Sequence, residues 1–320
     1  MRIQSLPELL ANPPEMPEFV LGPRLLPRKG RCMIFGQSGI GKSMLVHNLA
    51  FSLAAGQPWL GFTPPRAYRT LYLLAEGGEY SLWERSMHLQ EKRPIDLAVA
   101  GPNLHLTFDL NATMSNTGYP DIEAAVLSSK AEVVILDPAY KLMLGSDADA
   151  ESAKTFIRAC DRLIAATGCT LIVVHHSKKA AFDDNGFKVD RGRAEARGHT
   201  TFTEDFWDVL FQLKRTKREG HSIVVEKARH SNVETDEPIP LFFNYPLFLR
   251  KDEPGAEDPL LALLPAEWTP LAEVRVAVEA GLSLGEKSVR ERLRMAKEEG
   301  VLEVMPNPAR KNENLIRRKQ

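Results

Sequence analysis

The sequence predicts an α/β protein with a mostly parallel central sheet, and three features support this prediction. The first is a glycine-rich segment, GQSGIGKS at residues 36–43, between an apolar strand and a helical segment. The second is the alternation of fully apolar strands with helical segments up to residue 176, which is typical of a parallel sheet covered on both faces. The third is a change in the sequence pattern after residue 260, where two helical segments precede a short strand. We therefore expect one large domain and one small domain.

Length and composition are consistent with that plan. The 320 residues are 43% hydrophobic and 26% charged, which is ordinary for a soluble globular protein. The formal net charge of −1 provides no overall field for nucleic acid, so any such site must be a local patch. Cys32, Cys160 and Cys169 stand in apolar surroundings without metal-ligand spacing, which favours reduced core residues of a cytoplasmic protein. We expect neither a signal peptide nor a membrane-spanning segment.

The segment at residues 36–43 matches every fixed position of the G-x-x-x-x-G-K-[ST] phosphate loop. Glycines let backbone N–H groups surround phosphate oxygens, and the following helix directs the positive end of its dipole at the same anion. Lys42 is expected at the β- and γ-phosphates of ATP, and Ser43 at Mg²⁺. A glycine turn in an unrelated sheet protein is disfavoured because both flanks also match. The predicted nucleotide-binding residues are Gly36, Gln37, Ser38, Gly39, Ile40, Gly41, Lys42 and Ser43.

The remaining elements follow in order. Residues 1–30 are rich in proline and predict an extended arm laid over the core or onto a neighbour. Strands are expected at 31–35, 69–75, 104–106, 132–137 and 170–176, and helices at 44–55, 79–92, 119–130 and 151–166. Residues 177–198 form a long, charged, glycine-punctuated loop of the kind that is functional or disordered. Antiparallel strands at 206–215 and 222–228 and an edge strand at 241–249 complete the domain over 31–250.

After a linker at 251–259, residues 260–320 show the winged-helix order of helix, turn, helix, strand and basic hairpin. Four cations of the second helix could face a groove: Lys287, Arg290, Arg294 and Lys297. Four acids dilute that patch: Glu286, Glu291, Glu298 and Glu299. Binding of DNA and contact with a protein are equally compatible with this pattern.

Beyond the phosphate loop, three strand ends carry candidate catalytic groups. Asp137 ends an apolar strand, which is the pattern that places a carboxylate near Mg²⁺. Because Pro138 follows it, the base that activates water must come from elsewhere, and Glu76 lies at the edge where ligands bind such sheets. Glu79 is the alternative, although a helix-start acid there needs no catalytic role. His175 and His176 point to opposite faces, so they do not chelate one metal easily; a γ-phosphate sensor or a structural histidine fits this position.

These segments together resemble the RecA-like hexameric ATPases, in particular the RepA-type plasmid replicative helicases. The resemblance covers about residues 18–250. It rests on GQSGIGKS, LYLLAEGGEYSLWER, VVILDPAY, LIVVHHSKK and ARGHTTFTEDFWDVLFQLKR. It implies that Glu76 is the catalytic base, that Arg85 supports the site, that Asp137 serves Mg²⁺ and that His176 belongs to a sensor motif. The family's loops after the histidines line a central channel and hold single-stranded DNA.

One departure concerns the arginine that acts across a subunit interface in this family. Trp207 aligns with it, and an indole cannot neutralise a phosphate. The later segment VEKAR instead resembles the K-x-R finger of DnaB-like and RecA-like proteins, with Lys227 and Arg229 on one side of a strand. Solvent-facing basic residues on an edge strand are the alternative interpretation.

The leading hypothesis is an ATP- and Mg²⁺-dependent ATPase that forms a homo-oligomeric, hexameric ring and acts as a helicase or translocase on single-stranded DNA in replication or repair. The residues expected to contact DNA phosphates are Lys178, Lys179, Lys188, Arg191, Arg193 and Arg197. Other replication proteins are candidate partners of the winged helix. The alternative is a RecA-fold ATP switch, a regulator or loader that binds DNA or a protein without unwinding.

Overall fold

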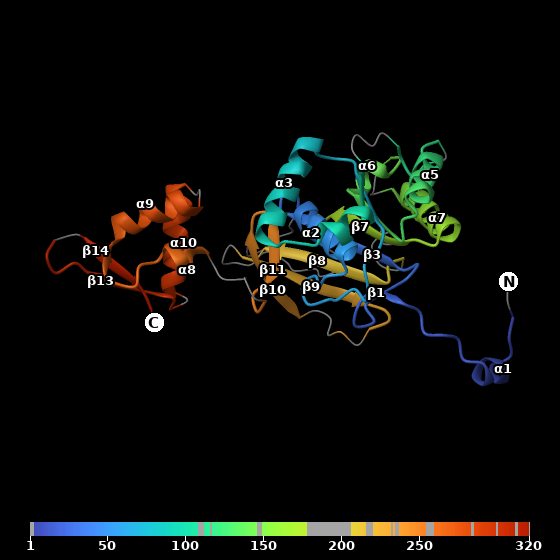
Figure 1. Cartoon of the computed structure of the whole chain (residues 1–320), viewed down its shortest axis with the longest axis horizontal. Coiled ribbons are helices and arrows are strands. Elements are labelled where there is room, and N and C mark those ends of the chain that lie inside the picture. The colour runs from blue at the N-terminus through green and yellow to red at the C-terminus, as the bar shows by residue number, and fades with distance from the viewer. Residues whose placement is uncertain are drawn as a thin grey trace. The chain divides into compact units, whose positions relative to one another are not determined.

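A computed structural model of the chain describes residues 3–107, 112–115, 117–145, 149–177, 206–215, 220–231, 233, 237–253, 259–282, 285–298, 300–310 and 313–319. These residues form two compact units, which divide between Arg250 and Lys251. Unit 1 contains the phosphate loop, and unit 2 contains the C-terminal helices (Figure 1). Each unit is described separately. No helix in the described part of the chain is long and apolar enough to cross a membrane.

The centre of unit 1 is a sheet of nine strands in the order β11-β10-β9-β8-β3-β7-β6-β4-β5 among the described residues. Six neighbouring strands are parallel: β8 (Val209–Arg215), β3 (Arg31–Gly36), β7 (Thr170–His176), β6 (Val133–Asp137), β4 (Thr70–Leu74) and β5 (Leu104–Thr107). An antiparallel extension follows β8: β9 (His221–Ala228), β10 (Pro238–Asn244) and β11 (Leu247–Arg250). The fold is thus mixed α/β with a large, mostly parallel sheet.

One predicted strand is wrong. The edge strand expected at 241–249 is the hairpin β10–β11, because the chain reverses at Tyr245 and Pro246. Proline lacks the N–H that a ladder needs, so its presence favours a turn over a continuous strand.

Helices cover both faces of the sheet. Helix α2 (Lys42–Ala55) packs on the face that presents Ile34 and Ile172. The opposite face, which presents Phe35 and Val173, is covered by α5 (Tyr119–Ser129), α6 (Ala139–Leu142) and α7 (Ala150–Thr167). The other helical segments of this region are α3 (Glu79–Lys92), α4 (Leu97–Ala100) and a short 3₁₀ turn at Gly101–Asn103. Burial on both faces explains why the parallel strands are apolar at every position rather than at alternate ones.

The N-terminal segment differs from the extended arm that the prolines predict. Residues Leu6–Ala11 form helix α1, which begins with a reciprocal capping box between Ser5 and Glu8. Strands β1 (Phe19–Leu21) and β2 (Leu26–Pro27) then form a small hairpin. Its apolar side chains are fully buried in the core that includes α2: Val20, Leu21, Leu25 and Leu26. Residues 19–27 are therefore a built-in part of unit 1.

Unit 2 has its own small core. In chain order it contains α8 (Pro259–Leu263), β12 (Thr269–Pro270), α9 (Leu271–Leu282), α10 (Glu286–Glu298), β13 (Leu302–Pro306) and β14 (Asn314–Arg318). The three strands pair antiparallel in the order β12-β14-β13. Val278, Val289 and Ile316 are fully buried between the helices and this sheet.

Candidate nucleotide-binding site

The ends of four parallel strands bring the predicted site residues together. The register pairs Gly36 of β3 with His176 of β7, and Leu74 of β4 with Asp137 of β6. A cavity of about 350 Å³ opens at this edge. Its lining includes Ser38, Gly39, Gly41, Lys42, Ser43, Met44, Glu76, Gly77, Arg85, Asp137, Pro138, Val174 and His176. Residues from five sequence segments therefore face one another where a parallel α/β sheet binds its ligand.

The turn of the phosphate loop depends on left-handed backbone at two glycines. Gly39 has a φ of +72° and Gly41 a φ of +99°, values that a side chain makes unfavourable. A Cβ on Gly41 would also approach the ring of Phe248 to 3.0 Å. Helix α2 begins directly afterwards at Lys42. Its first N–H groups and its dipole are thus directed at the cavity, as phosphate binding requires.

The amine of Lys42 is held inside the loop. It donates hydrogen bonds to the carbonyl oxygens of Gly36 at 2.9 Å and Gln37 at 2.7 Å, and lies 3.2 Å from Nδ1 of His176. Burial lowers the pKa of Lys42 to about 8, against the opposing attraction of Asp137 and Glu76. The amine therefore remains mostly protonated at neutral pH. His176 accepts from it through Nδ1 in that state, since an ammonium only donates.

Asp137 is buried at the end of β6. The hydroxyl of Tyr72 donates to its Oδ2 at 2.6 Å, and Ser43 also forms a hydrogen bond with it. Burial raises the pKa of Asp137, while these two hydrogen bonds and the charge of Lys42 oppose the rise. A hydroxyl and a carboxylate beside a phosphate loop are hard oxygen donors, which fit Mg²⁺. No cluster of three or more His, Cys, Asp or Glu side chains suited to a metal occurs among the described residues.

Glu76 lies just beyond β4, and its side chain is 46% exposed. The Tyr140 hydroxyl donates to its Oε1, and Nζ of Lys141 lies 4.0 Å from the same oxygen. The Tyr140 ring is 5.3 Å from the ring of His176, centre to centre. Tyr140 thus connects the candidate base with the candidate sensor, a role that sequence reasoning missed. The only available signal was its place in the DPAY segment directly after Asp137.

The alternative base, Glu79, stands elsewhere. It begins helix α3, is exposed, and is absent from the residues that line the cavity. Its position in the first helical turn is explained by the favourable interaction of a carboxylate with the helix dipole.

Arg85 reaches the cavity from helix α3. That helix is tied to α2 by a contact of 3.2 Å between Oγ of Ser86 and Nε2 of His47. Burial, and secondarily the charge of Arg85, lower the pKa of His47 to about 3, so this histidine is neutral at physiological pH. Because His47 is neutral, its contact with Ser86 joins α3 to α2 without placing a second cation near Arg85.

The two histidines at the end of β7 point to opposite faces of the sheet. His175 is fully buried, whereas His176 lines the cavity. Side chains alternate along a strand, so the two rings point away from each other.

Lys227 and Arg229 lie at the opposite edge of the sheet from the phosphate loop. Strand β9 runs antiparallel to β8, so that Ala228 pairs with Val209 at the start of β8. Arg229 forms an ion pair of 3.4 Å with Asp208. Because the six-residue strand β3 spans about 20 Å, neither cation reaches the site of its own chain.

Two further predictions concern Trp207 and the basic residues expected to contact DNA. Trp207 is fully buried and packs edge-on against the ring of Phe206, which explains it as a core residue. The residues predicted to contact DNA, Lys178, Lys179, Lys188, Arg191, Arg193 and Arg197, lie outside the described residues.

A phosphate loop after a central parallel strand, with a buried carboxylate at the end of β6, defines a P-loop NTPase of the RecA-like fold. The sequence matches the model of the AAA domain family over residues 2–181, more than half of the chain. The chain therefore belongs to the AAA domain family and is a RecA-fold ATPase.

A KaiC-like protein from the hyperthermophilic archaeon Pyrococcus horikoshii is similar in structure. The match has 13% sequence identity and a TM-score of 0.49, and covers 70% of this chain and 90% of that chain. A similarity of this size carries no information about activity. None of the curated proteins matches the sequence.

Proposed function

We propose that this protein hydrolyses ATP at the interfaces of a homo-oligomeric, hexameric ring and uses the energy to move along or unwind single-stranded DNA. The observation that carries the proposal is the division of candidate catalytic groups between two edges of one sheet. The phosphate loop, Glu76 and Asp137 lie at one edge, and Arg229 lies at the other. Head-to-tail packing of copies would bring the second edge of one subunit to the first edge of the next.

Within the site, each residue has a role that its geometry supports. Glu76, exposed and adjacent to two glycines, accepts a proton from the attacking water. Lys42 and Arg85 stabilise the negative charge that develops on the γ-phosphate. Ser43 and Asp137 would hold Mg²⁺, which neutralises phosphate charge when bound. His176 contacts Lys42 and leads directly into the segment predicted to bind DNA, as a sensor of nucleotide state requires.

Arg229 supplies the cation from the neighbouring subunit, with Lys227 beside it. A finger that acts in trans must be absent from its own site, and the 3.4 Å ion pair with Asp208 keeps Arg229 at the far edge. Its side chain is 45% exposed, so a neighbour can approach it.

The decisive experiment mixes two inactive variants. Arg229→Ala should bind ATP nearly as well as the parent but hydrolyse it slowly, because a finger acts mainly on the transition state. Glu76→Gln lacks the base. When subunits of both kinds are mixed, one interface can combine an intact Glu76 with an intact Arg229, and ATP hydrolysis should partly return.

A thermal melt of Arg229→Ala serves as the control, since the variant also loses its ion pair with Asp208. Full activity of Arg229→Ala alone would assign Arg229 to the surface of β9 and remove the support for a ring. Mixtures that remain inactive although the subunits exchange would also contradict the proposal.

Interaction with DNA is tested separately. ATP hydrolysis should rise strongly with single-stranded DNA. Neutralising Lys178, Lys179, Arg191 and Arg193 together should weaken DNA binding and reduce its salt dependence by about 0.7 in log–log slope for each lost phosphate contact. Basal hydrolysis should survive. Turnover that ignores DNA, together with unchanged DNA affinity, would favour an ATP switch, a regulator or loader that grips its target without unwinding.

For unit 2 we propose a winged helix, in which α9 and α10 form the helical pair and β13 and β14 the wing. The order of its elements and the three-stranded antiparallel sheet support this assignment.

A further inference from the structure

A second cavity lies within unit 2, between helices α9 and α10 and strands β13 and β14. Its volume is about 180 Å³, enough for one large apolar side chain. The floor is apolar and consists of Leu271, Leu293, Leu302, Val304 and Ile316. The rim is cationic and consists of Arg275, Arg290, Arg294 and Lys297. An apolar pocket surrounded by positive charge is the usual form of a site that anchors one side chain and orients its neighbours.

The four rim cations differ in their partners. Arg290 contacts Glu286, and Arg294 contacts Glu291 and Glu298, so these two charges are largely balanced by the exposed side of α10. Arg275 and Lys297 have no ion pair with the described residues. Arg275 is partly exposed and Lys297 is exposed. A carboxylate that enters the pocket would balance these two charges.

We propose that this cavity binds an acidic peptide segment of another protein, with one aliphatic or aromatic side chain on the apolar floor and flanking carboxylates at Arg275 and Lys297. Charge complementarity selects the acidic flanks, and the apolar floor selects the anchor. A nucleic acid fits less well, because its phosphates would run along α10 past Glu286, Glu291 and Glu298. All of the residues that line this cavity belong to unit 2.

The test uses the full-length protein and short fluorescein-labelled synthetic peptides in fluorescence polarisation. The first peptide places one Phe between runs of Asp and Glu. The second replaces that Phe with Ala, and the third replaces the acids with Lys. We expect the first peptide to bind about tenfold more tightly than the second, and the third not to bind, since both the anchor and the charge contribute.

A double charge reversal, Arg275→Glu with Lys297→Glu, should weaken binding of the first peptide at least about tenfold. The matched control is Lys154→Glu with Lys319→Glu, which changes the net charge equally at two exposed cations outside the cavity. The control should bind like the parent. Thermal melts and ATP hydrolysis of both double variants establish that each protein is folded.

Three results would overturn the proposal. The first is equal affinity for the Phe and Ala peptides, or no binding of either. The second is an equal loss of affinity in the control double variant. The third is tight binding of a DNA duplex that is lost with Arg275→Glu and Lys297→Glu, which would assign the rim to nucleic acid.

Discussion

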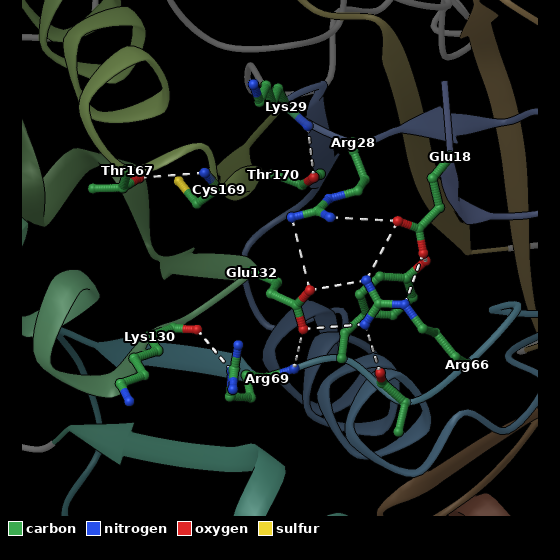
Figure 2. Close-up of polar contacts among 12 residues, drawn as sticks. Glu18, Arg28, Lys29, Arg66, Arg69, Lys130, Glu132, Thr167, Cys169 and Thr170 are labelled. Carbon is green, nitrogen blue, oxygen red and sulfur yellow. Dashed lines mark hydrogen bonds and ion pairs between the residues drawn. The ribbon is translucent and has the colours of Figure 1, made fainter. Parts of the chain in front are cut away.

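Charged side chains gather at both edges of the central sheet, but they are paired with opposite charges at one edge and buried with fewer partners at the other. At the edge where the parallel strands begin, Arg66 lies between Glu18 and Glu132 and donates to each at 2.8 Å (Figure 2). Arg28 approaches the same two carboxylates, at 3.4 and 3.7 Å. Hydrogen bonding from Arg66 lowers the pKa of Glu18. Burial raises the pKa of Glu132, but hydrogen bonds from Arg66 and Arg69 outweigh it, and the net shift is downward.

At the edge where those strands end, charges are buried with less compensation. Burial lowers the pKa of Lys42 and raises that of Asp137, so both groups move toward their neutral forms. Opposite charges that form ion pairs stabilise a structure. Groups whose pKa values are shifted toward the neutral form are typical of functional sites. The charges at the first edge therefore stabilise the fold, whereas those at the second edge line the candidate nucleotide-binding site.

The largest effect is expected from Lys42→Ala. ATP turnover should fall about 10³-fold or more, because a cation positioned at the developing phosphate charge is lost. The thermal melt should change little, since within the described part of the chain the amine bonds only to carbonyl groups of its own loop and to His176. Hydrolysis rates and circular dichroism check both statements. Turnover at the parent rate would contradict the phosphate-loop assignment.

Glu76→Gln should slow hydrolysis by about 10²-fold, the effect of losing a positioned base, while ATP binding is retained. Single-turnover hydrolysis and equilibrium binding of a fluorescent ATP analogue separate the two quantities. Glu79→Gln is the matched control, because Glu79 is an exposed acid three residues away that does not line the cavity. A slow Glu79→Gln with a normal Glu76→Gln would exchange their roles.

The shifted pKa of Lys42 predicts a pH dependence with opposite signs for binding and stability. Above about pH 8 the free protein loses the ammonium, so ATP affinity should fall by up to about tenfold per pH unit. The pKa is lowered from 10.5 to about 8 on folding, so the unfolded chain binds more protons in this window. The contribution of Lys42 to the stability of the free protein should therefore rise with pH. Affinity that stays constant through this window would place the charge elsewhere.

Tyr140→Phe should reduce kcat by about three- to tenfold with KM unchanged, since it removes one hydrogen bond that orients Glu76. The phenyl ring still packs against His176. Tyr140→Ala also removes that contact and should be slower. Steady-state kinetics of the two variants distinguish orientation of the base from packing of the sensor. A Tyr140→Phe protein with parent kcat would leave the tyrosine a packing residue.

The smallest effect is expected at the opposite edge. Glu132→Gln should reduce the free energy of unfolding by about 1 kcal/mol or less, because the Arg66 side chain is 41% exposed and solvent screens the pair. ATP hydrolysis should not change. Urea unfolding with and without added salt measures the effect, and Glu91→Gln, in an exposed pair with His88, is the control. A loss of hydrolysis in Glu132→Gln would mean that the two edges are coupled.

Features with local causes could be predicted from the amino-acid sequence. The glycines of the phosphate loop, the apolar runs of β4, β6 and β7, and the polar residues at the ends of these strands act within a few residues, so pattern alone located them. The meeting of Lys42, Glu76, Asp137 and His176 at one edge also followed, because parallel strands of one sheet end on the same side.

Features that depend on residues far apart in the sequence could be seen only in the folded protein. The apolar side chains of the hairpin at residues 19–27 are buried because they pack in the same core as α2 and the sheet. Arg66 donates hydrogen bonds to both Glu18 and Glu132, which are 114 residues apart in the sequence. Tyr140 joins the site only because α6 turns back beside Glu76 and His176. Arg229 is separated from its own phosphate loop because β9 is antiparallel to β8. Each of these features depends on the order and direction of the strands in the sheet. The periodicity of apolar residues shows which face of a strand is buried, but it does not show which element packs against that face.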